Sequence, residues 1–128
     1  MQPEELKSYF EKAEGIGVLS TCNGAGGVNS ALYSRPHFME DGSIAFIMND
    51  RRSHSNIKEN PKAAYLFVEE GSKSKGIRLY LKKEKETDDK ELINKIRRHH
   101  SGSGNDEDKK RFLVYFSLIE TRDLVEKG

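Results

Sequence analysis

The segment from Arg51 to Asn56 gathers side chains that bind anions. The segment consists of Arg51, Arg52, Ser53, His54 and Ser55 in direct succession, followed by Asn56. Guanidinium groups hold phosphate oxygens through paired hydrogen bonds, and the first amide groups of a helix are free to donate to an anion. Because residues 56–60 have a helical pattern that ends before Pro61, this segment predicts a phosphate-binding loop that leads into a short helix. An alternative stays open, in which Ser53 or Ser55 caps the helix and the arginines face water.

Arg35 and His37 form another candidate site, where a predicted strand over residues 28–35 ends at Pro36. Residues two apart in an extended chain share one face, so both side chains can meet one ligand. The same pattern is equally typical of an exposed strand end. Arg78 alternates with apolar neighbours in a later predicted strand, so it projects either toward a site or into water. We take Arg35, His37 and Arg78 as candidate substrate residues.

The rest of the chain predicts a small domain built mainly of antiparallel strands. Short apolar, β-branched runs between turn residues predict strands over 16–21, 28–35, 43–48, 63–69, 77–85 and 111–120. Apolar residues at helical spacing predict one helix between Pro3 and Gly15 and another over residues 90–100. Short strands at hairpin spacing favour a closed or nearly closed sheet with helices at its ends.

Composition narrows the classes of protein to consider. A chain of 128 residues is long enough for one compact domain, and its net charge of +1 selects neither for nucleic acid nor for an anionic membrane. Cys22 is the single cysteine, so no internal disulfide and no cysteine-based metal site is expected. The N-terminus lacks the layout of a signal peptide, and no run approaches the roughly 18 apolar residues of a membrane span. We therefore expect a soluble cytoplasmic protein without a metal.

The order of these segments resembles the pyridoxamine 5′-phosphate oxidase-like family of FMN-binding split barrels. The likeness runs from about Leu6 to about Leu81 and includes the stretches GIGVLSTCN, VNSALYSRPHF, SIAFIMNDRRSHSNIKENPKAAYLF and GIRLYL. Its strongest element is the basic loop and short helix with Asn60-Pro61, followed at once by an apolar strand. The resemblance implies an α+β, predominantly β fold, an antiparallel split β-barrel of about six strands with short flanking helices. It implies a single FMN-binding domain over residues 1–128.

The same resemblance implies FMN as the cofactor and a homodimer with the flavin at its interface. Carried over by position, Arg51, Arg52, Ser53, His54 and Asn56 hold the phosphate, while Ser34, Arg35, Phe46, Ile47 and Met48 line the flavin ring. The implied function is an oxidoreductase that uses a small-molecule substrate or electron donor. The family's oxidases usually carry an Arg-Lys pair where this chain has Arg52-Ser53, which weakens the phosphate site unless Arg51 or His54 substitutes. The basic residues with which the true oxidases hold their substrate, late in the chain, have no secure match here, so oxidation of pyridoxamine phosphate is not implied. Two alternatives are a flavin carrier or sensor without turnover and a barrel that binds deazaflavin or haem.

Overall fold

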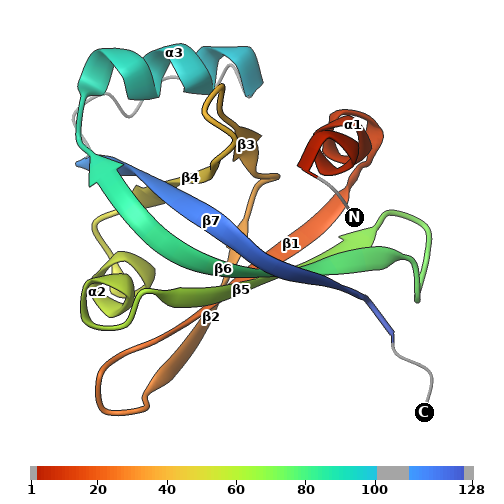
Figure 1. Ribbon diagram of the computed structural model, residues 1–128, viewed down its shortest axis with the longest axis horizontal. Helices are drawn as coiled ribbons and strands as arrows, with labels where there is room; N and C mark the ends of the chain where they lie inside the picture. The colour runs from red at the N-terminus through yellow and green to blue at the C-terminus, as the bar shows by residue number, and fades with distance from the viewer. Residues whose placement is uncertain (1–2, 101–109, 126–128) are drawn as a thin grey trace.

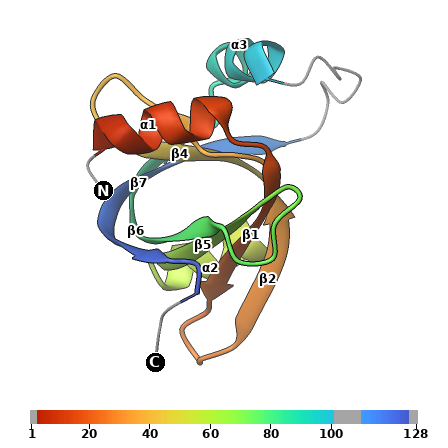
Figure 2. The ribbon, with the colours of Figure 1, turned by 90° about the vertical axis from the view of Figure 1, so that its right-hand side faces the viewer.

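The computed structural model describes residues 3–100 and 110–125 (Figure 1). Within this part, seven strands form one antiparallel sheet in the order β2-β1-β5-β6-β7-β4-β3, and Figure 2 shows the sheet curled around a common axis. This half-barrel confirms the predicted fold class. The strand that the sequence analysis missed is β3, which has only 2 residues and is too short to produce an alternating pattern.

The helices and strands follow one another as α1 (Pro3–Lys12), β1 (Gly15–Cys22), β2 (Val28–Tyr33), β3 (His37–Phe38), β4 (Ile44–Asn49), α2 (Arg52–Glu59), β5 (Lys62–Glu69), β6 (Gly76–Thr87), α3 (Lys90–His100) and β7 (Arg111–Asp123). Most of them fall where the sequence pattern predicts them. The main difference is α2, which begins at Arg52 and not at Asn56. Its first turn is made of polar residues, so it lacks the apolar periodicity by which a helix is recognised.

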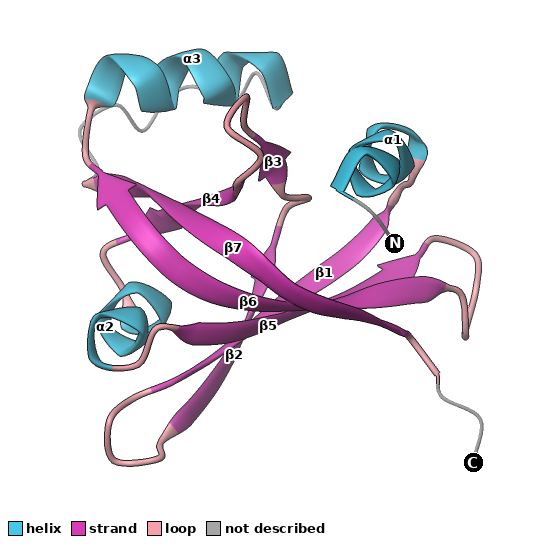
Figure 3. Cartoon of the chain, viewed as in Figure 1, coloured by secondary structure: helices cyan, strands magenta, loops and turns pink. Residues whose placement is uncertain are grey.

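The interior of the half-barrel is packed with aromatic and aliphatic side chains. Its largest fully buried members are Tyr65, Phe46, Phe67, Phe116, Leu6, Leu19, Ile44, Met48, Ile57, Leu79 and Leu81. Helix α1 closes one end of the barrel (Figure 2), because the side chains of Leu6 and Phe10 on one face of the helix enter this core. Helix α3 covers a smaller apolar cluster on the outer side of β4 and β7, where Ile93 packs with Ala45 and Leu113. Figure 3 shows that α2 lies apart from both helices, beside the β1–β2 hairpin.

The β1–β2 hairpin has a turn that its sequence specifies. The side-chain oxygen of Asn23 accepts hydrogen bonds from the amides of Ala25 at 2.9 Å and Gly27 at 2.7 Å. Gly26 has a φ of 88°, a left-handed conformation that glycine adopts without steric cost. The turn therefore sets the register in which β2 pairs with β1 and leaves the other side of β2 as a free edge of the sheet.

The sheet has two ends, β2 on one side and β4 with β3 on the other. The ring of Tyr33 at the end of β2 meets the ring of Phe46 on β4 edge to face, with centroids 6.0 Å apart. These rings approach without any backbone pairing between β2 and β4. The split of the barrel is therefore a seam between β2 and β4, and α2 follows directly from the β4 side of it. Among the described residues, no helix is long and apolar enough to cross a membrane.

Candidate functional site

A cavity of about 410 Å³ lies in the seam between the two ends of the sheet. It is lined by residues of β2, the end of β4 and the start of α2: Asn29, Ser30, Ala31, Leu32, Tyr33, Ser34, Ile47, Asn49, Arg51, Arg52 and Ser53. We call this the seam cavity. Two adjacent guanidinium groups, the N-terminus of a helix and a free strand edge all border this cavity. This combination of groups suits a ligand that carries an anion at one end and a polar planar body.

The N-terminus of α2 is open toward an anion. Arg51 precedes the helix in an extended conformation, and no side chain caps the helix. The first donor within the helix is the amide of Ser55, which donates to the carbonyl of Arg51 at 3.0 Å. The amides of Arg52, Ser53 and His54 come before it and have no carbonyl one turn earlier to bind. Ser53 and Ser55 lie inside α2 and do not cap it, so this part of the alternative is wrong, whereas Arg51 and Arg52 are exposed, as the alternative has it.

The β2 side of the cavity offers backbone groups. Among the described strands β2 pairs with β1 alone, so the N–H and C=O groups on its other edge can bind a ligand. The hydroxyl of Tyr65 on β5 donates to the carbonyl of Ser34 at 3.1 Å and so positions the chain where β2 ends. Gly17 makes this bond possible, since a Cβ there would lie 1.9 Å from the Tyr65 hydroxyl. Burial raises the pKa of the Tyr33 hydroxyl, and its hydrogen bond with the side chain of Ser53 lowers the pKa by a smaller amount.

Half of the predicted cofactor residues line the seam cavity. These are Ser34, Ile47, Arg51, Arg52 and Ser53. Phe46 and Met48 do not line it: their side chains are 1% and 0% exposed and point into the barrel. Successive side chains of a strand alternate between its faces, so only Ile47 of this trio reaches the cavity.

His54 and Asn56 anchor α2 to the barrel with their side chains and do not line the cavity. The amide of Asn56 donates to the hydroxyl of Thr21 on β1 at 3.1 Å, and both residues are buried. The ring of His54 is 0% exposed and hydrogen-bonds the carboxylate of Glu86 at 2.9 Å. The prediction that these two side chains contact the phosphate therefore does not match their placement. The cause is the longer helix, which turns them away from the cavity.

Arg35 also has a structural role. Its guanidinium donates to the carbonyls of Phe10 at 2.9 Å and Ala13 at 2.7 Å, where α1 ends. The last carbonyls of a helix have no partner within it, and a cation is favourable there. Arg35 thus fastens α1 to the segment after β2, and it faces away from the seam cavity that Ser34 lines.

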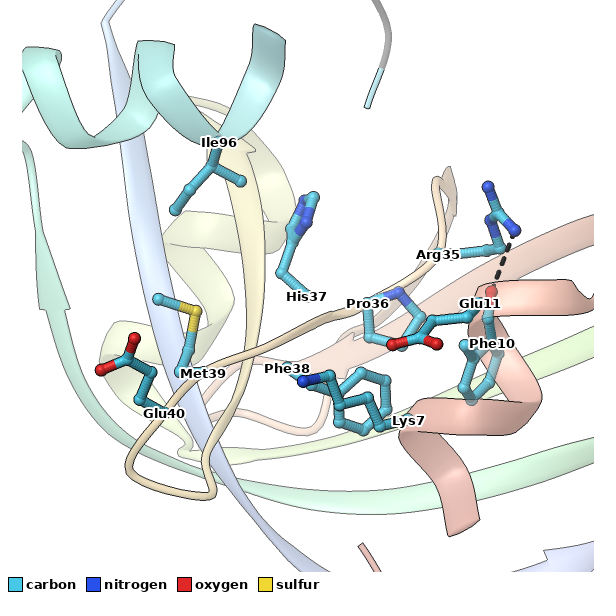
Figure 4. A pocket seen from close by; sticks show the side chains of 10 residues that line it. All are labelled: Lys7, Phe10, Glu11, Arg35, Pro36, His37, Phe38, Met39, Glu40 and Ile96. Atoms are coloured by element: carbon cyan, nitrogen blue, oxygen red, sulfur yellow. Dashed lines mark hydrogen bonds between the residues drawn. The ribbon is translucent and has the colours of Figure 1, made fainter. Parts of the chain in front are cut away.

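Arg35 and His37 line another cavity, of about 420 Å³, between α1, α3 and the segment that contains β3. Figure 4 shows Arg35 turned toward α1, while His37 and Ile96 lie on the α3 side. Arg35 and His37 thus line one cavity, which is not the seam cavity, and their side chains turn toward different helices. Arg78 lies outside both, with its Nε donating to the carbonyl of Asp123 at 2.9 Å.

We expect Arg35→Ala to destabilise the protein and to leave binding in the seam cavity nearly unchanged. Loss of the bonds to the end of α1 costs about 1 to 3 kcal/mol, which lowers Tm by roughly 5 °C or more. Calorimetry measures the first effect, and titration with the predicted cofactor measures the second. An unchanged Tm together with a large loss of cofactor affinity would show that Arg35 contacts the cofactor directly.

Sequence reasoning missed Asn29, Ser30 and Asn49 as residues of the cavity. Asn29 lies near α2, with its side-chain amide 3.4 Å from the hydroxyl of Ser53. No local pattern marks these three residues, because a polar residue near a strand end is as typical of solvent exposure as of a binding site. Only the meeting of β2 with α2 distinguishes them.

Comparison with known proteins supports the fold. No family model and no curated protein matches the sequence. Among solved structures, an FMN-binding protein from Syntrophomonas wolfei subsp. wolfei has a TM-score of 0.77 at 20% identity, covering 98% of this chain and 87% of that one. An F420 reductase has a TM-score of 0.66 at 18% identity, covering 91% of this chain and 94% of its own.

A putative pyridoxamine 5′-phosphate oxidase from Lactobacillus delbrueckii has a TM-score of 0.65 at 17% identity, with 93% of this chain and 91% of that chain covered. At these sequence identities the likeness shows a shared backbone fold. It confirms the split-barrel fold implied by the sequence resemblance.

Proposed function

We propose that this protein binds FMN in the seam cavity and uses it to transfer electrons to or from a small molecule. The observation that carries the proposal is the pair Arg51 and Arg52 beside the uncapped N-terminus of α2, on the wall of a cavity of about 410 Å³. Solved structures with the same fold include an FMN-binding protein and an F420 reductase, which supports a flavin or deazaflavin as the ligand.

The residues present fit a phosphorylated flavin. Two exposed guanidinium groups, the hydroxyl of Ser53 and the first amides of α2 are all donors, as a phosphate dianion requires. The free edge of β2 offers both donors and acceptors for the polar rim of the flavin ring, and Ile47 offers an apolar contact. Bound FMN would supply the electron transfer. The chain's own residues would bind it, orient it and limit the access of water.

The outer face of the sheet supports a homodimer. In the register of β1, Val18 lies opposite both Leu32 of β2 and Leu66 of β5, and Ile16 lies opposite Val68. Opposed residues of paired strands project to the same side, so these five side chains form one apolar face. Ile16 is 62% and Leu32 is 76% exposed in the single chain.

A second copy of this chain is the partner that we propose for the apolar face. Leu32 belongs both to this face and to the lining of the seam cavity. A dimer that buries the face would therefore bring its interface to the cavity, in keeping with a flavin held between subunits. Contiguous exposed apolar surface of this kind marks an interaction site more often than free surface.

The direct test is an absorption spectrum of the purified protein, followed by titration with FMN, riboflavin and a phosphorylated deazaflavin. We expect FMN to bind at least about tenfold more tightly than riboflavin, because only FMN carries the phosphate. If the deazaflavin binds more tightly than FMN, the cofactor of this protein is a deazaflavin and not FMN. Binding of neither class would contradict the proposal.

The redox function needs a separate measurement. We expect NADH or NADPH to reduce the bound flavin, and the rate of bleaching of the flavin absorption measures this step. Bound flavin that no donor reduces and no acceptor reoxidises would favour a carrier or sensor over an oxidoreductase.

A further inference from the structure

His54 contributes to the seam site through its backbone and to the barrel through its side chain. It is the third residue of α2, so its amide is one of the free donors at the start of the helix. Its ring is fully buried and stacks on Phe112 of β7, with centroids 3.8 Å apart and planes 8° from parallel. The position of the ring therefore determines where the first turn of α2 lies.

A hydrogen bond fixes the orientation of this ring. Nε2 of His54 lies 2.9 Å from Oε2 of Glu86 on β6, and a carboxylate can only accept, so Nε2 carries the proton. Lys83 bonds the other oxygen of the same carboxylate. Burial by itself raises the pKa of Glu86, but the hydrogen bonds from Lys83 and His54 outweigh it and the pKa is lowered. The carboxylate is thus ionised at neutral pH.

The remaining groups around the ring do not replace this bond. Among the described residues, buried Nδ1 of His54 has no hydrogen-bond partner, and Oδ1 of Asp50 lies 4.0 Å from it. The opposite side of α2 is held separately by the β1–β2 hairpin, where the amide of Gly24 donates to Glu59 at 3.0 Å. The link between His54 and Glu86 therefore ties the first turn of α2 to β6.

We propose that His54 and Glu86 are positioning residues for the phosphate site: their bond holds the first turn of α2 so that its amides and the adjacent arginines meet the phosphate together. This inference rests on the proposed function, since it concerns the phosphate end of the same ligand. It assigns no contact between the His54 ring and the ligand.

The test compares FMN with riboflavin in His54→Phe, Glu86→Leu and the double variant. Glu86→Leu removes both carboxylate oxygens and keeps much of the side-chain volume. His54→Phe keeps an aromatic ring against Phe112 and removes the bond to Glu86. We expect each single variant to weaken FMN binding about five- to tenfold and to leave riboflavin binding unchanged. The double variant should weaken FMN binding no more than the stronger single variant, because both changes remove the same link. His54→Gln, which restores an N–H donor, should recover part of the affinity.

Ile93→Ala provides the matched control, because Ile93 is 2% exposed and packs from α3 onto Ala45 and Leu113, away from α2. It should lower Tm without changing the ratio of the two dissociation constants. A folded His54→Phe or Glu86→Leu protein with the wild-type ratio would overturn the positioning role. If His54→Phe fails to fold, Glu86→Leu decides alone, since the side chain of Glu86 is 23% exposed and its replacement leaves the core intact. A wild-type protein that does not distinguish FMN from riboflavin would instead overturn the phosphate site itself, and this inference with it.

Discussion

Replacing Arg51 and Arg52 together by alanine is expected to weaken FMN binding by about 100-fold and to leave riboflavin binding unchanged. Each guanidinium that bonds a phosphate oxygen contributes roughly 1.5 kcal/mol or more, and two such contributions correspond to a factor of this size. Both side chains are exposed at the rim of the seam cavity, so their loss removes charge without opening the core. Fluorescence titration with both flavins measures the two dissociation constants.

Lys73→Ala with Lys75→Ala is the matched control, because this double variant also removes two positive charges, but from the exposed loop between β5 and β6. This variant should bind FMN as the wild type does, apart from a small effect of net charge that salt suppresses. A folded double-arginine variant with wild-type affinity for FMN would show that the phosphate lies elsewhere. Equal losses for FMN and riboflavin would indicate that the arginines hold the ring or the ribityl chain.

Introducing a carboxylate into the proposed dimer interface should have the other large effect. Ile16→Asp places a charge on the apolar face, and each copy in a symmetric dimer brings the same change. Burying these unpaired charges should weaken dimerisation by at least about 100-fold. Sedimentation velocity over a range of concentrations measures the dissociation constant. Ile16 does not line the seam cavity, so weaker FMN binding in this variant would reflect the lost partner.

Lys12→Asp introduces the same side chain on the exposed side of α1 and should leave the assembly unchanged. Two results would count against the homodimer. A wild-type protein that sediments as a monomer at high concentration excludes it outright. An Ile16→Asp protein that dimerises as tightly as the wild type places the interface on another face of the molecule.

These predictions separate the two walls of the seam cavity. One wall consists of α2 and the arginines at its start, and buried side chains hold this helix against β1, β6 and β7. The comparison of FMN with riboflavin tests this wall. The other wall is the free edge of β2, and the apolar face next to it is exposed in the single chain. Measurement of the oligomeric state tests this wall. A ligand that lies between the two walls would depend on both sets of contacts.

Local pattern was sufficient to predict most of the fold. Strands such as β1 and β5 alternate or are continuously apolar, and their ends are marked by turn residues, so their spacing along the chain determined a small antiparallel sheet. The cluster of arginines after β4 was equally visible, and it predicted an anion site because guanidinium groups beside a helix N-terminus can hold phosphate oxygens. Arg51, Arg52 and Ser53 accordingly line the cavity.

The direction of individual side chains was decided only by the tertiary structure. Whether α2 begins at Arg52 or at Asn56 is a matter of one helical turn, but that turn carries the side chains of His54 and Asn56 from the cavity into the core. Arg35 is equally suited to bind a ligand or to cap a helix, and the proximity of the α1 carbonyls determined its role. The sequence by itself determined most of the elements and the kinds of side chain that are available to a ligand. The packing of α1, α2 and the seam decided which polar groups remain free, because a hydrogen bond used inside the fold is no longer available to a ligand.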